Sequence, residues 1–224
     1  MQTLVRRVLH RILPQTVQPR KLWLGLAKGA TATIDFRWDA AFYFGRHEPD
    51  LHRQYRRLLR RGMRCFDVGM YRGWDALGFA QLTGAEVVSF DGDERSLEQT
   101  ARFLSPSGAS ITLVHAYLSD GSDGNLTIDR AAAAYFEPDF IKIDVEGSEA
   151  SVLRGGKQLL TDRKPTLVIE THGMGAEADT IEVLKAAGYD WLIVERSAFL
   201  SEARSLEHNR WLICNGKKRF TEAR

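Results

Sequence analysis

Residues 64–77, RCFDVGMYRGWDAL, decide the fold class of this 224-residue chain. The stretch begins with CFDV, which is short and apolar enough to be a buried strand. Asp67 lies near the end of this strand, and Gly69 and Gly73 follow in a loop before a helical pattern begins at Asp75. A strand, a glycine loop and a helix in this order are typical of α/β proteins that bind a nucleotide beyond the end of a sheet.

The rest of the sequence alternates between strand and helix patterns. We expect strands at 65–68, 86–91, 111–114, 139–144, 166–170, 190–195 and 210–214. We expect helices at 49–62, 75–84, 94–104, 148–160 and 180–188. Strands joined by crossover helices form a parallel sheet with helices on both faces. Because no convincing helix separates the last two strands, we predict an α/β fold with a doubly wound, mostly parallel sheet and an antiparallel last strand.

The composition is that of a globular protein with one sizeable core, with 44% hydrophobic and 27% charged residues. No apolar run reaches about 18 residues, so we expect no membrane-spanning helix. Cys65 and Cys214 fall within strand patterns and are expected to be buried thiols. Two unpaired cysteines fit a reducing compartment, so we predict a cytoplasmic protein.

The N-terminal quarter of the chain is basic. Residues 1–65 carry 14 Lys or Arg against 4 Asp or Glu, whereas the remainder is mildly acidic. Residues 4–13 place their apolar side chains on one helical stripe, and Pro14 ends this pattern. We therefore divide the chain into a basic N-terminal segment with an amphipathic helix, residues 1–47, and a globular domain, residues 48–224.

Three interpretations of the N-terminal helix remain open. It packs on the domain or on a second subunit in a homodimer, it lies on a membrane surface through residues 1–20, or it serves as a transit peptide or a nucleic-acid contact. It is not a secretory signal, because arginines interrupt its apolar stretch and no small-residue cleavage site follows. Aromatic residues do not interleave the basic runs, which argues against single-stranded nucleic acid as a partner.

In a parallel sheet, ligands bind beyond the carboxyl ends of the strands. The polar side chains expected there are those of Asp67, Asp91, His115, Asp144, Glu170 and His172. Four of the five central strands end on or next to an acid, which favours a ligand with hydroxyl groups and a cationic centre. The competing interpretation is that each acid only caps the helix that follows it.

The glycine loop itself limits the class of ligand that can bind. Gly69 allows a turn with positive φ, and Gly73 allows the helix to approach the strand closely. The loop lacks the second glycine of a G-x-G-x-x-G pyrophosphate site, because Tyr71 and Arg72 occupy its middle. Asp91 ends the next strand, where an acid can accept hydrogen bonds from both hydroxyls of a ribose. An aminoacyl nucleoside without phosphates fits this set, and S-adenosylmethionine is the predicted cofactor.

Five segments resemble, in order and spacing, the FkbM family of S-adenosylmethionine-dependent methyltransferases. They are FDVGMYRGW, VVSFDGDERSLEQ, YLSDGSDG, IKIDVEGSEASVLRG and PTLVIETHG. The resemblance runs over residues 48–189, and the I-K-I-D-V-E-G block is its most specific part. It implies the class I, Rossmann-like methyltransferase fold and methyl transfer to oxygen on a sugar, a polyketide or another small molecule.

The resemblance also implies roles for the residues of the first two strand tips. Asp67, Gly69 and Gly73 match the loop that holds the methionine part of the cofactor, and Asp91 matches the acid that binds its ribose. The family reads D-V-G-A-N-x-G, and here a methionine and Tyr71 replace the Ala-Asn pair. We expect Tyr71 to border the methionine end of the pocket, where its ring can stack or its hydroxyl can donate.

The later strand tips are implied to surround the adenine and the reacting methyl group. His115 and Ala116 match the loop that flanks adenine, and Asp144 and Glu146 match acids close to the sulfonium. An acceptor hydroxyl must lie in line with the methyl group and is helped by a general base. We predict that base to be His172, because the unperturbed pKa of histidine is near 6.5, and we predict a catalytic set of His172, Asp144 and Glu146.

A metal site is not predicted, and two other polar residues are given structural explanations. A metal ion held by Asp144, Glu170 and His172 is left out of the prediction, because such scattered ligand sets are common by chance. Glu149 opens a helix, where the helix dipole explains a carboxylate without any further role. Lys142 is expected to be a buried charge with a carboxylate partner that the sequence does not identify.

Other classes of function remain open. A nucleotide-dependent oxidoreductase would need G-x-G-x-x-G after a strand, and the sequence contains no such string. A binding protein that has lost its cofactor, or a nucleic-acid methyltransferase that uses the basic N-terminal segment, is the remaining alternative. The N-P-P-Y tetrapeptide of amino-directed nucleic-acid methyltransferases is absent, and its place reads DVEG at residues 144–147. We therefore predict an O-methyltransferase that acts on a small-molecule hydroxyl.

Overall fold

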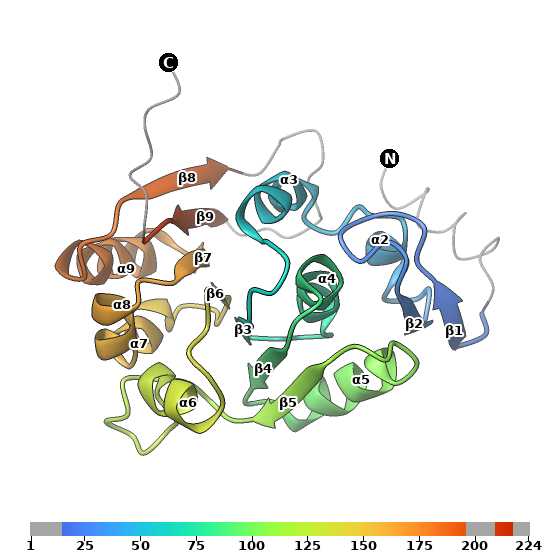
Figure 1. The fold of residues 1–224 in the computed structure, drawn as a ribbon, viewed down its shortest axis with the longest axis horizontal. Coiled ribbons are helices and arrows are strands. Elements are labelled where there is room, and N and C mark those ends of the chain that lie inside the picture. Colours follow the sequence, from blue (N-terminus) through green and yellow to red (C-terminus); the bar gives the residue numbers. More distant parts are fainter. Residues whose placement is uncertain (1–14, 196–208, 217–224) are drawn as a thin grey trace.

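The computed structural model describes residues 15–195 and 209–216. Its centre is a seven-stranded sheet with helices on both faces (Figure 1). The strands of this sheet are β3 (Cys65–Val68), β4 (Val87–Asp91), β5 (Ile111–His115), β6 (Phe140–Ile143), β7 (Thr166–His172), β8 (Trp191–Glu195) and β9 (Asn209–Cys214). The helices are α2 (Ala40–Tyr43), α3 (Pro49–Leu58), α4 (Trp74–Thr83), α5 (Glu94–Leu104), α6 (Ile128–Ala134), α7 (Glu149–Arg154), α8 (Lys157–Asp162) and α9 (Met174–Ala186). A separate small sheet pairs β1 (Gln18–Lys21) with β2 (Thr31–Ile34).

The order of strands in the large sheet is β5-β4-β3-β6-β7-β9-β8. The chain runs outward from β3 through β4 and β5, and then returns to place β6 on the other side of β3, in parallel. Strand β9 pairs antiparallel with both β7 and β8. The predicted α/β fold with a mostly parallel sheet and an antiparallel last strand is confirmed. The reversal of strand order between β3 and β6 is the position where open sheets of this type bind ligands.

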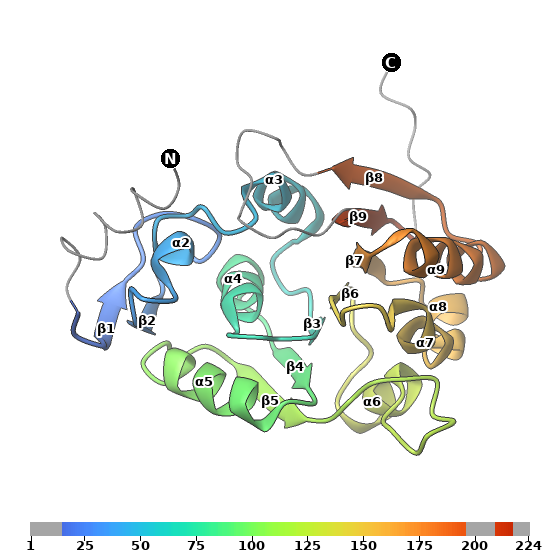
Figure 2. The ribbon, with the colours of Figure 1, turned by 180° about the vertical axis from the view of Figure 1, so that it is seen from behind.

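The two faces of the sheet pack against different helices. Phe66 and Val68 of β3 lie in one apolar cluster with residues of α6 to α9. Cys65, which points to the other face, lies in a cluster with residues of α3 and α4. Figures 1 and 2 show these two groups of helices on opposite sides of the sheet. Because both faces are covered, polar groups of the strands come together at the strand ends.

Residues 15–47, which belong to the predicted basic segment, pack on helices of the large sheet. Leu22 and Phe42 lie in one apolar cluster with Leu77 of α4. The predicted helix over residues 4–13 lies outside the described residues, and the boundary between segment and domain stays a prediction. Within the described part, this segment contributes core to the same globular body.

The predicted single helix over residues 148–160 is wrong. The chain forms two helices there, α7 and α8, with Gly155 and Gly156 between them. A Cβ atom on Gly155 would lie 2.0 Å from the carbonyl oxygen of Ser119, so the two backbones approach too closely for any side chain. The sequence pattern does not predict the short elements β1, β2, α2 and α6. Each has only four to seven residues, which is too short to show a clear periodicity.

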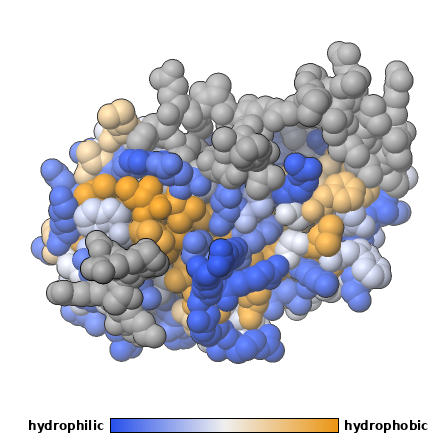
Figure 3. Space-filling model, turned by 90° about the horizontal axis from the view of Figure 1, so that it is seen from above, coloured by the Kyte–Doolittle hydropathy of each residue, from blue (hydrophilic) through white to orange (hydrophobic). Residues whose placement is uncertain are grey.

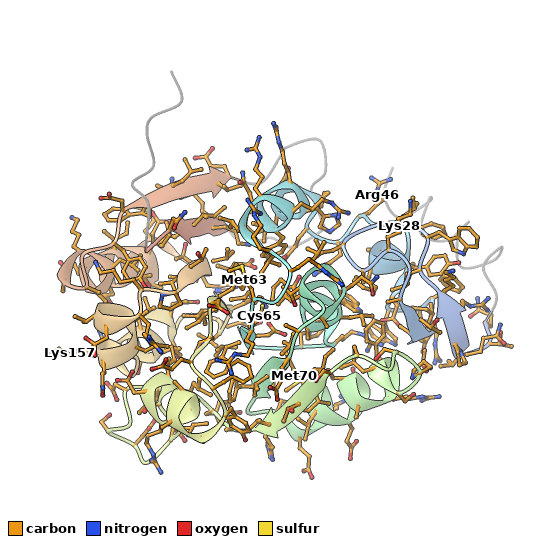
Figure 4. The ribbon with its side chains drawn as sticks, in the orientation of Figure 1. Lys28, Arg46, Met63, Cys65, Met70 and Lys157 are labelled. Atoms are coloured by element: carbon orange, nitrogen blue, oxygen red, sulfur yellow. The ribbon has the colours of Figure 1, made fainter. Side chains whose placement is uncertain are left out.

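Both cysteines are buried free thiols, as predicted. Figure 4 labels Cys65 in the interior of the molecule. Burial raises the pKa of the Cys65 and Cys214 thiols, because the apolar surroundings disfavour a thiolate. Both side chains therefore serve as packing groups of the core.

The surface is mixed in character. On the face drawn in Figure 3, hydrophobic side chains gather in patches between hydrophilic ones. Among the residues that the structure describes, no helix combines the length and the apolar character that crossing a membrane requires.

Candidate active site

A cavity of about 770 Å³ lies at the carboxyl ends of β3, β4, β5 and β6. This volume is within the range of roughly 300–1,000 Å³ that is usual for small-molecule sites. Six predicted site residues line the cavity: Gly69, Tyr71, Asp91, Ala116, Asp144 and Glu146. The other four lie behind or beside its wall: Asp67, Gly73, His115 and His172.

The glycine loop after β3 is held against β4 and β6. The backbone N–H groups of Gly69 and Met70 donate to the carbonyl oxygen of Phe90, over 2.9 and 3.2 Å. Gly69 has a φ of 85°, and a Cβ atom there would lie 1.8 Å from the carbonyl oxygen of Asp144. Only glycine fits this close approach. Gly73 also has positive φ and begins α4, with Thr100 against its Cα.

The two bulky residues of the loop do not fill the cavity. Tyr71 has a φ of 48° and is about half exposed, with its ring edge-on to Trp74 at 5.6 Å. Its backbone N–H donates to Asp91 Oδ2 over 3.1 Å. Arg72 turns toward the N-terminal segment, where its Nε donates to Asp39 Oδ1 over 2.9 Å. The loop therefore keeps room for a ligand, with Tyr71 at the border of the cavity.

Asp67 lies behind the loop and is fully buried. Ser89 Oγ donates to its Oδ2 over 3.2 Å, and Lys142 Nζ lies 3.7 Å from its Oδ1. Burial raises the pKa of Asp67 to about 7, against the lowering effect of the Lys142 charge. Lys142 in turn donates to the carbonyl oxygen of Gly69 over 3.0 Å. Asp67 is therefore not among the residues that line the cavity, and it is linked to the loop through Lys142. Its predicted role in binding the cofactor stays a prediction.

The structure identifies the carboxylate partners of Lys142, which the sequence did not. Its carboxylate partners are Asp144 at 3.2 Å, Asp75 at 3.6 Å and Asp67 at 3.7 Å. Burial alone would lower the pKa of Lys142, but the charges of these acids outweigh it and raise the pKa well above its usual value. The lysine therefore stays charged at the wall of the cavity.

The carboxylate of Asp91 faces the cavity at the end of β4. Its Oδ2 accepts from the Tyr71 N–H, and its Oδ1 accepts from the Asp93 N–H over 2.9 Å. Each oxygen can still accept a second hydrogen bond, as two ribose hydroxyls would require. His115 lies beside the wall, where its Nε2 is 3.0 Å from the carbonyl oxygen of Gly92.

Tyr117 is a cavity residue that the sequence analysis missed. It follows Ala116 in the loop after β5, and its ring lies over Gly92, where a Cβ atom would be 2.1 Å from the ring. The side chain is exposed, so its aromatic face is available to a ligand. The only sequence signal was its position directly after His115 and Ala116.

His172 is the last residue of β7, and three acids surround it. Its Nδ1 lies 2.8 Å from Glu149 Oε1, and its Nε2 lies 3.4 Å from Asp144 Oδ1 and 3.8 Å from Glu170 Oε1. Burial lowers the pKa of His172, but the hydrogen bond to Glu149 and the charges of the acids outweigh it, so the net pKa is raised. The expectation of an unperturbed histidine is corrected: these carboxylates favour its protonated form.

Glu149 is a residue to which the sequence analysis gave only a structural explanation. It does begin α7, as predicted, but its side chain is fully buried and accepts from the Gly147 N–H over 2.9 Å. Glu146, which was preferred, is exposed at the cavity wall with a φ of 50°. The position of Glu149 at the start of a helix already accounted for its carboxylate, so no further role was assigned to it. Only the strand order shows that β7 places His172 beside it.

His47 and Glu48 also line the cavity, and neither belongs to a recognised motif. Glu48 is buried, and burial raises the pKa of its carboxyl group to about 8. Its Oε2 has no hydrogen-bond partner and lies 4.0 Å from His47 Nε2. The sequence gives no signal for these two residues, because the loop before α3 reaches the site only through tertiary packing.

Comparison with known protein families supports the resemblance seen in the sequence. Residues 124–191 match the family described as the methyltransferase FkbM domain. This match covers Asp144, Glu146, Glu170 and His172. It begins at residue 124, after the glycine loop and Asp91. A search of curated proteins finds no significant match.

Solved structures share the fold at low sequence identity. An S-adenosylmethionine-dependent O-methyltransferase from Thermotoga maritima has a TM-score of 0.56 and 14% identity, covering 77% of this chain and 67% of that one. Aeropyrum pernix fibrillarin with natively bound S-adenosyl-L-methionine has a TM-score of 0.54 and 12% identity, covering 70% and 68%. Methyltransferase FkbM from Methylobacillus flagellatus has a TM-score of 0.53 and 17% identity, covering 73% of this chain and 52% of that one.

The strand order and these likenesses place the chain in the class I, Rossmann-like methyltransferase fold. Over residues 124–191, which are less than half of the chain, the sequence is similar to the methyltransferase FkbM domain. The predicted fold class is therefore confirmed, and the match over residues 124–191 supports the predicted family and the predicted cofactor, S-adenosylmethionine.

Proposed function

We propose that this protein transfers a methyl group from S-adenosylmethionine to a hydroxyl group of a small molecule, such as a sugar or a polyketide. The observation that carries the proposal is the cavity at the carboxyl ends of β3 to β6, which combines the glycine loop with the Asp91 carboxylate on a methyltransferase fold. The FkbM domain match supports the methyltransferase part of the proposal. The class of acceptor is carried over from the resemblance to the family.

The cavity wall offers a matching group for each part of the cofactor. Asp91 would accept from the ribose hydroxyls, and Tyr117 would stack on the adenine beside Ala116. The backbone of the Gly69 loop would hold the methionine part. Asp144, next to this loop, would place its carboxylate near the positive sulfonium. The cofactor supplies an electrophilic methyl group, so the protein has to position the acceptor and provide a route for its proton.

The residues beside Asp144 can manage that proton. Asp144 lines the cavity, and His172 lies directly behind it with Nε2 at 3.4 Å. A hydroxyl group held in line with the methyl group at about 3 Å would be oriented by Asp144. Because the surrounding acids favour protonated His172, the histidine could take up the proton only when it enters the reaction neutral, at pH values above its raised pKa.

Calorimetry of cofactor binding tests the proposal most directly. Wild type should bind S-adenosylmethionine and S-adenosylhomocysteine, and Asp91→Ala should weaken binding about thirtyfold, or ~2 kcal/mol, because a carboxylate acceptor for two hydroxyls is lost. Asp162→Ala, which removes an exposed carboxylate from α8, is the matched control and should bind like wild type. No heat with wild type, or equal affinity in Asp91→Ala, would contradict the proposal.

A labelled-methyl assay tests the acceptor class. Purified protein is incubated with S-adenosylmethionine carrying a radioactive methyl group and with separate pools of sugars, hydroxylated polyketides and RNA. Label should enter the small-molecule pools and be released by reagents that cleave methyl ethers. Label that enters only RNA would instead favour the nucleic-acid alternative.

A further inference from the structure

We propose that Asp144, Glu170 and His172 form a binding site for a divalent metal ion at the edge of the cavity. One ligand atom of each residue lies within 4.8 Å of the other two. His172 Nε2 is 3.4 Å from Asp144 Oδ1 and 3.8 Å from Glu170 Oε1. Ligands bound about 2.1 Å from a metal lie roughly 3.0–3.5 Å apart. The distance between His172 and Asp144 is already in this range, and that between His172 and Glu170 is slightly longer.

The local structure explains why these atoms converge. Glu170 and His172 are two residues apart on β7, so their side chains leave the same face of the strand. Asp144 follows the neighbouring parallel strand β6, whose Ile143 pairs with Ile169. The end of one strand thus brings its carboxylate beside the face that carries the other two residues.

In each of the two carboxylate ligands, one oxygen contacts a group outside the site. The other oxygen therefore lies on the side of the remaining ligands. Asp144 Oδ2 lies 3.2 Å from Lys142 Nζ, and this leaves Oδ1 toward His172. Glu170 Oε2 accepts from Trp211 Nε1 over 3.2 Å, and this leaves Oε1 on the inner side. A site held in place before its ion arrives loses less side-chain freedom on binding.

The third ligand has the support that metal-bound histidines usually have. His172 Nδ1 lies 2.8 Å from Glu149 Oε1, and a carboxylate there can only accept, so Nδ1 carries a proton. This arrangement turns the lone pair of neutral His172 onto Nε2, toward Asp144 and Glu170. A carboxylate, a histidine and a metal in this sequence form a recurrent arrangement that fixes the ring and raises its basicity.

A separate observation also calls for a cation. Glu149 Oε2 is buried without a hydrogen-bond partner, although the other oxygen of the same carboxylate holds His172. Asp144, Glu149 and Glu170 place three carboxylates around this one histidine, with side chains 21%, 0% and 1% exposed. Buried carboxylates are expensive unless they are paired or coordinate a metal.

One nitrogen and two carboxylate oxygens suit Mn²⁺, Fe²⁺, Co²⁺ or Zn²⁺ better than the all-oxygen shells of Ca²⁺. Three protein ligands leave positions for other donors, and Asp144 opens the site to the cavity. If the proposed methyl transfer is correct, an acceptor hydroxyl could occupy such a position. With the ion bound, His172 Nε2 would be a ligand and not the base, and the ion would instead lower the pKa of the hydroxyl so that its proton can pass to water. An acceptor with two neighbouring oxygens would gain most.

The site is tested by titrating full-length, chelator-treated protein with MnCl₂. Binding is measured by calorimetry and by the loss of the electron-spin-resonance signal of free Mn²⁺. Wild type should bind one ion. Glu170→Gln should weaken binding at least tenfold, and Glu149→Gln, which acts only through His172, should weaken it about 10- to 100-fold. Unfolding curves show whether each variant stays folded.

Glu48→Gln is the matched control, because His47, Glu48 and Asp75 form a second group of possible ligands whose atoms also lie within 4.8 Å. It should bind Mn²⁺ like wild type, and loss of binding in Glu48→Gln with retention in Glu170→Gln would move the site and overturn the inference. Cofactor calorimetry separates the two proposals. Wild type that binds S-adenosylmethionine but no Mn²⁺ overturns the metal site alone, and the reverse result overturns the proposed function alone.

Discussion

Tyr71 occupies a backbone conformation, φ of 48°, that glycine and asparagine adopt far more readily than tyrosine. The family pattern that this sequence resembles has asparagine there. The structure shows that the conformation is kept, because the Tyr71 N–H bonds Asp91 and its carbonyl accepts from Thr100 Oγ1 over 3.1 Å. Tyrosine at this position therefore places a larger side chain at the cavity border, and two hydrogen bonds of its backbone hold the loop in place.

We predict that Tyr71→Asn keeps S-adenosylmethionine affinity within about threefold, or ~0.7 kcal/mol, of wild type. The ring lies at the border of the cavity and packs on Trp74, so its removal neither opens nor closes the cofactor site. Calorimetry at fixed pH measures the effect. Cofactor binding that exists only in Tyr71→Asn would mean that tyrosine blocks the site, and that the natural protein has lost its activity.

Glu48 gives the clearest dependence of stability on pH. Burial raises its pKa to about 8 in the folded protein, whereas an unfolded chain has an ordinary glutamate. Between these two pKa values the folded state binds more protons than the unfolded state, so the contribution of Glu48 to stability falls as pH rises. Wild type should lose stability relative to Glu48→Gln from pH 5 to pH 8.

Urea unfolding of both proteins at pH 5, 6.5 and 8 measures this difference. The gap between wild type and Glu48→Gln should widen steadily with pH, because glutamine has no charge to bury. Parallel pH profiles for the two proteins would show that Glu48 titrates like an exposed acid.

At the scale of elements, a buried ion pair joins the described part of the N-terminal segment to the glycine loop. Asp39, which precedes α2, accepts from Arg72 Nε and from Trp74 Nε1, over 2.9 and 3.2 Å. Asp39 is fully buried and Arg72 is 8% exposed. The bulky arginine of the loop is accommodated because this segment supplies a carboxylate for it.

Replacing Asp39 with alanine should destabilise the protein by about 3–5 kcal/mol, because it leaves a buried guanidinium without its counter-charge. The double variant Asp39→Ala with Arg72→Met should recover part of this loss, since no unpaired charge remains. A urea double-mutant cycle gives the coupling energy. Equal destabilisation in the single and double variants would show that these side chains stabilise the protein by packing and not by their charges.

At the scale of the whole molecule, we propose that the N-terminal helix predicted for residues 4–13 attaches the protein weakly to an anionic membrane surface. Its arginines would each contribute about 1 kcal/mol near such a surface. In the described part of the same segment, Trp23 and Trp38 are 67% and 58% exposed. Figure 4 labels Lys28 and Arg46 on this segment, and both are exposed. Aromatic and basic side chains together suit a lipid interface.

Deleting residues 1–14 should abolish sedimentation with anionic vesicles and leave S-adenosylmethionine affinity unchanged. The deletion stops there because β1 begins at Gln18 and belongs to the folded body. Neutral vesicles serve as the control lipid, and high salt should release wild type from anionic ones. A truncated protein that changes its oligomer mass would favour the dimer interpretation, and one that unfolds would make the stripe part of the core.

The sequence by itself determined the features that depend on neighbours along the chain. The periodicity of strands and helices predicted the sheet, and the resemblance of the I-K-I-D-V-E-G block predicted the family. The loop of Gly69 and Gly73 was also readable, because positive φ and close packing leave glycine as the residue that fits. Asp91 was found for the same reason, since a strand tip 22 residues after Gly69 is a local feature.

Only the tertiary structure decided which of these residues work together. His172 meets Glu149 and Asp144 because β6 and β7 are neighbours in the sheet, and Lys142 meets Asp67 because β3 lies on the other side of β6. Such contacts depend on strand order and on closing long loops, which local periodicity does not encode. The burial that raises the pKa of Glu48 arises in the same way, from packing between segments that the sequence keeps apart.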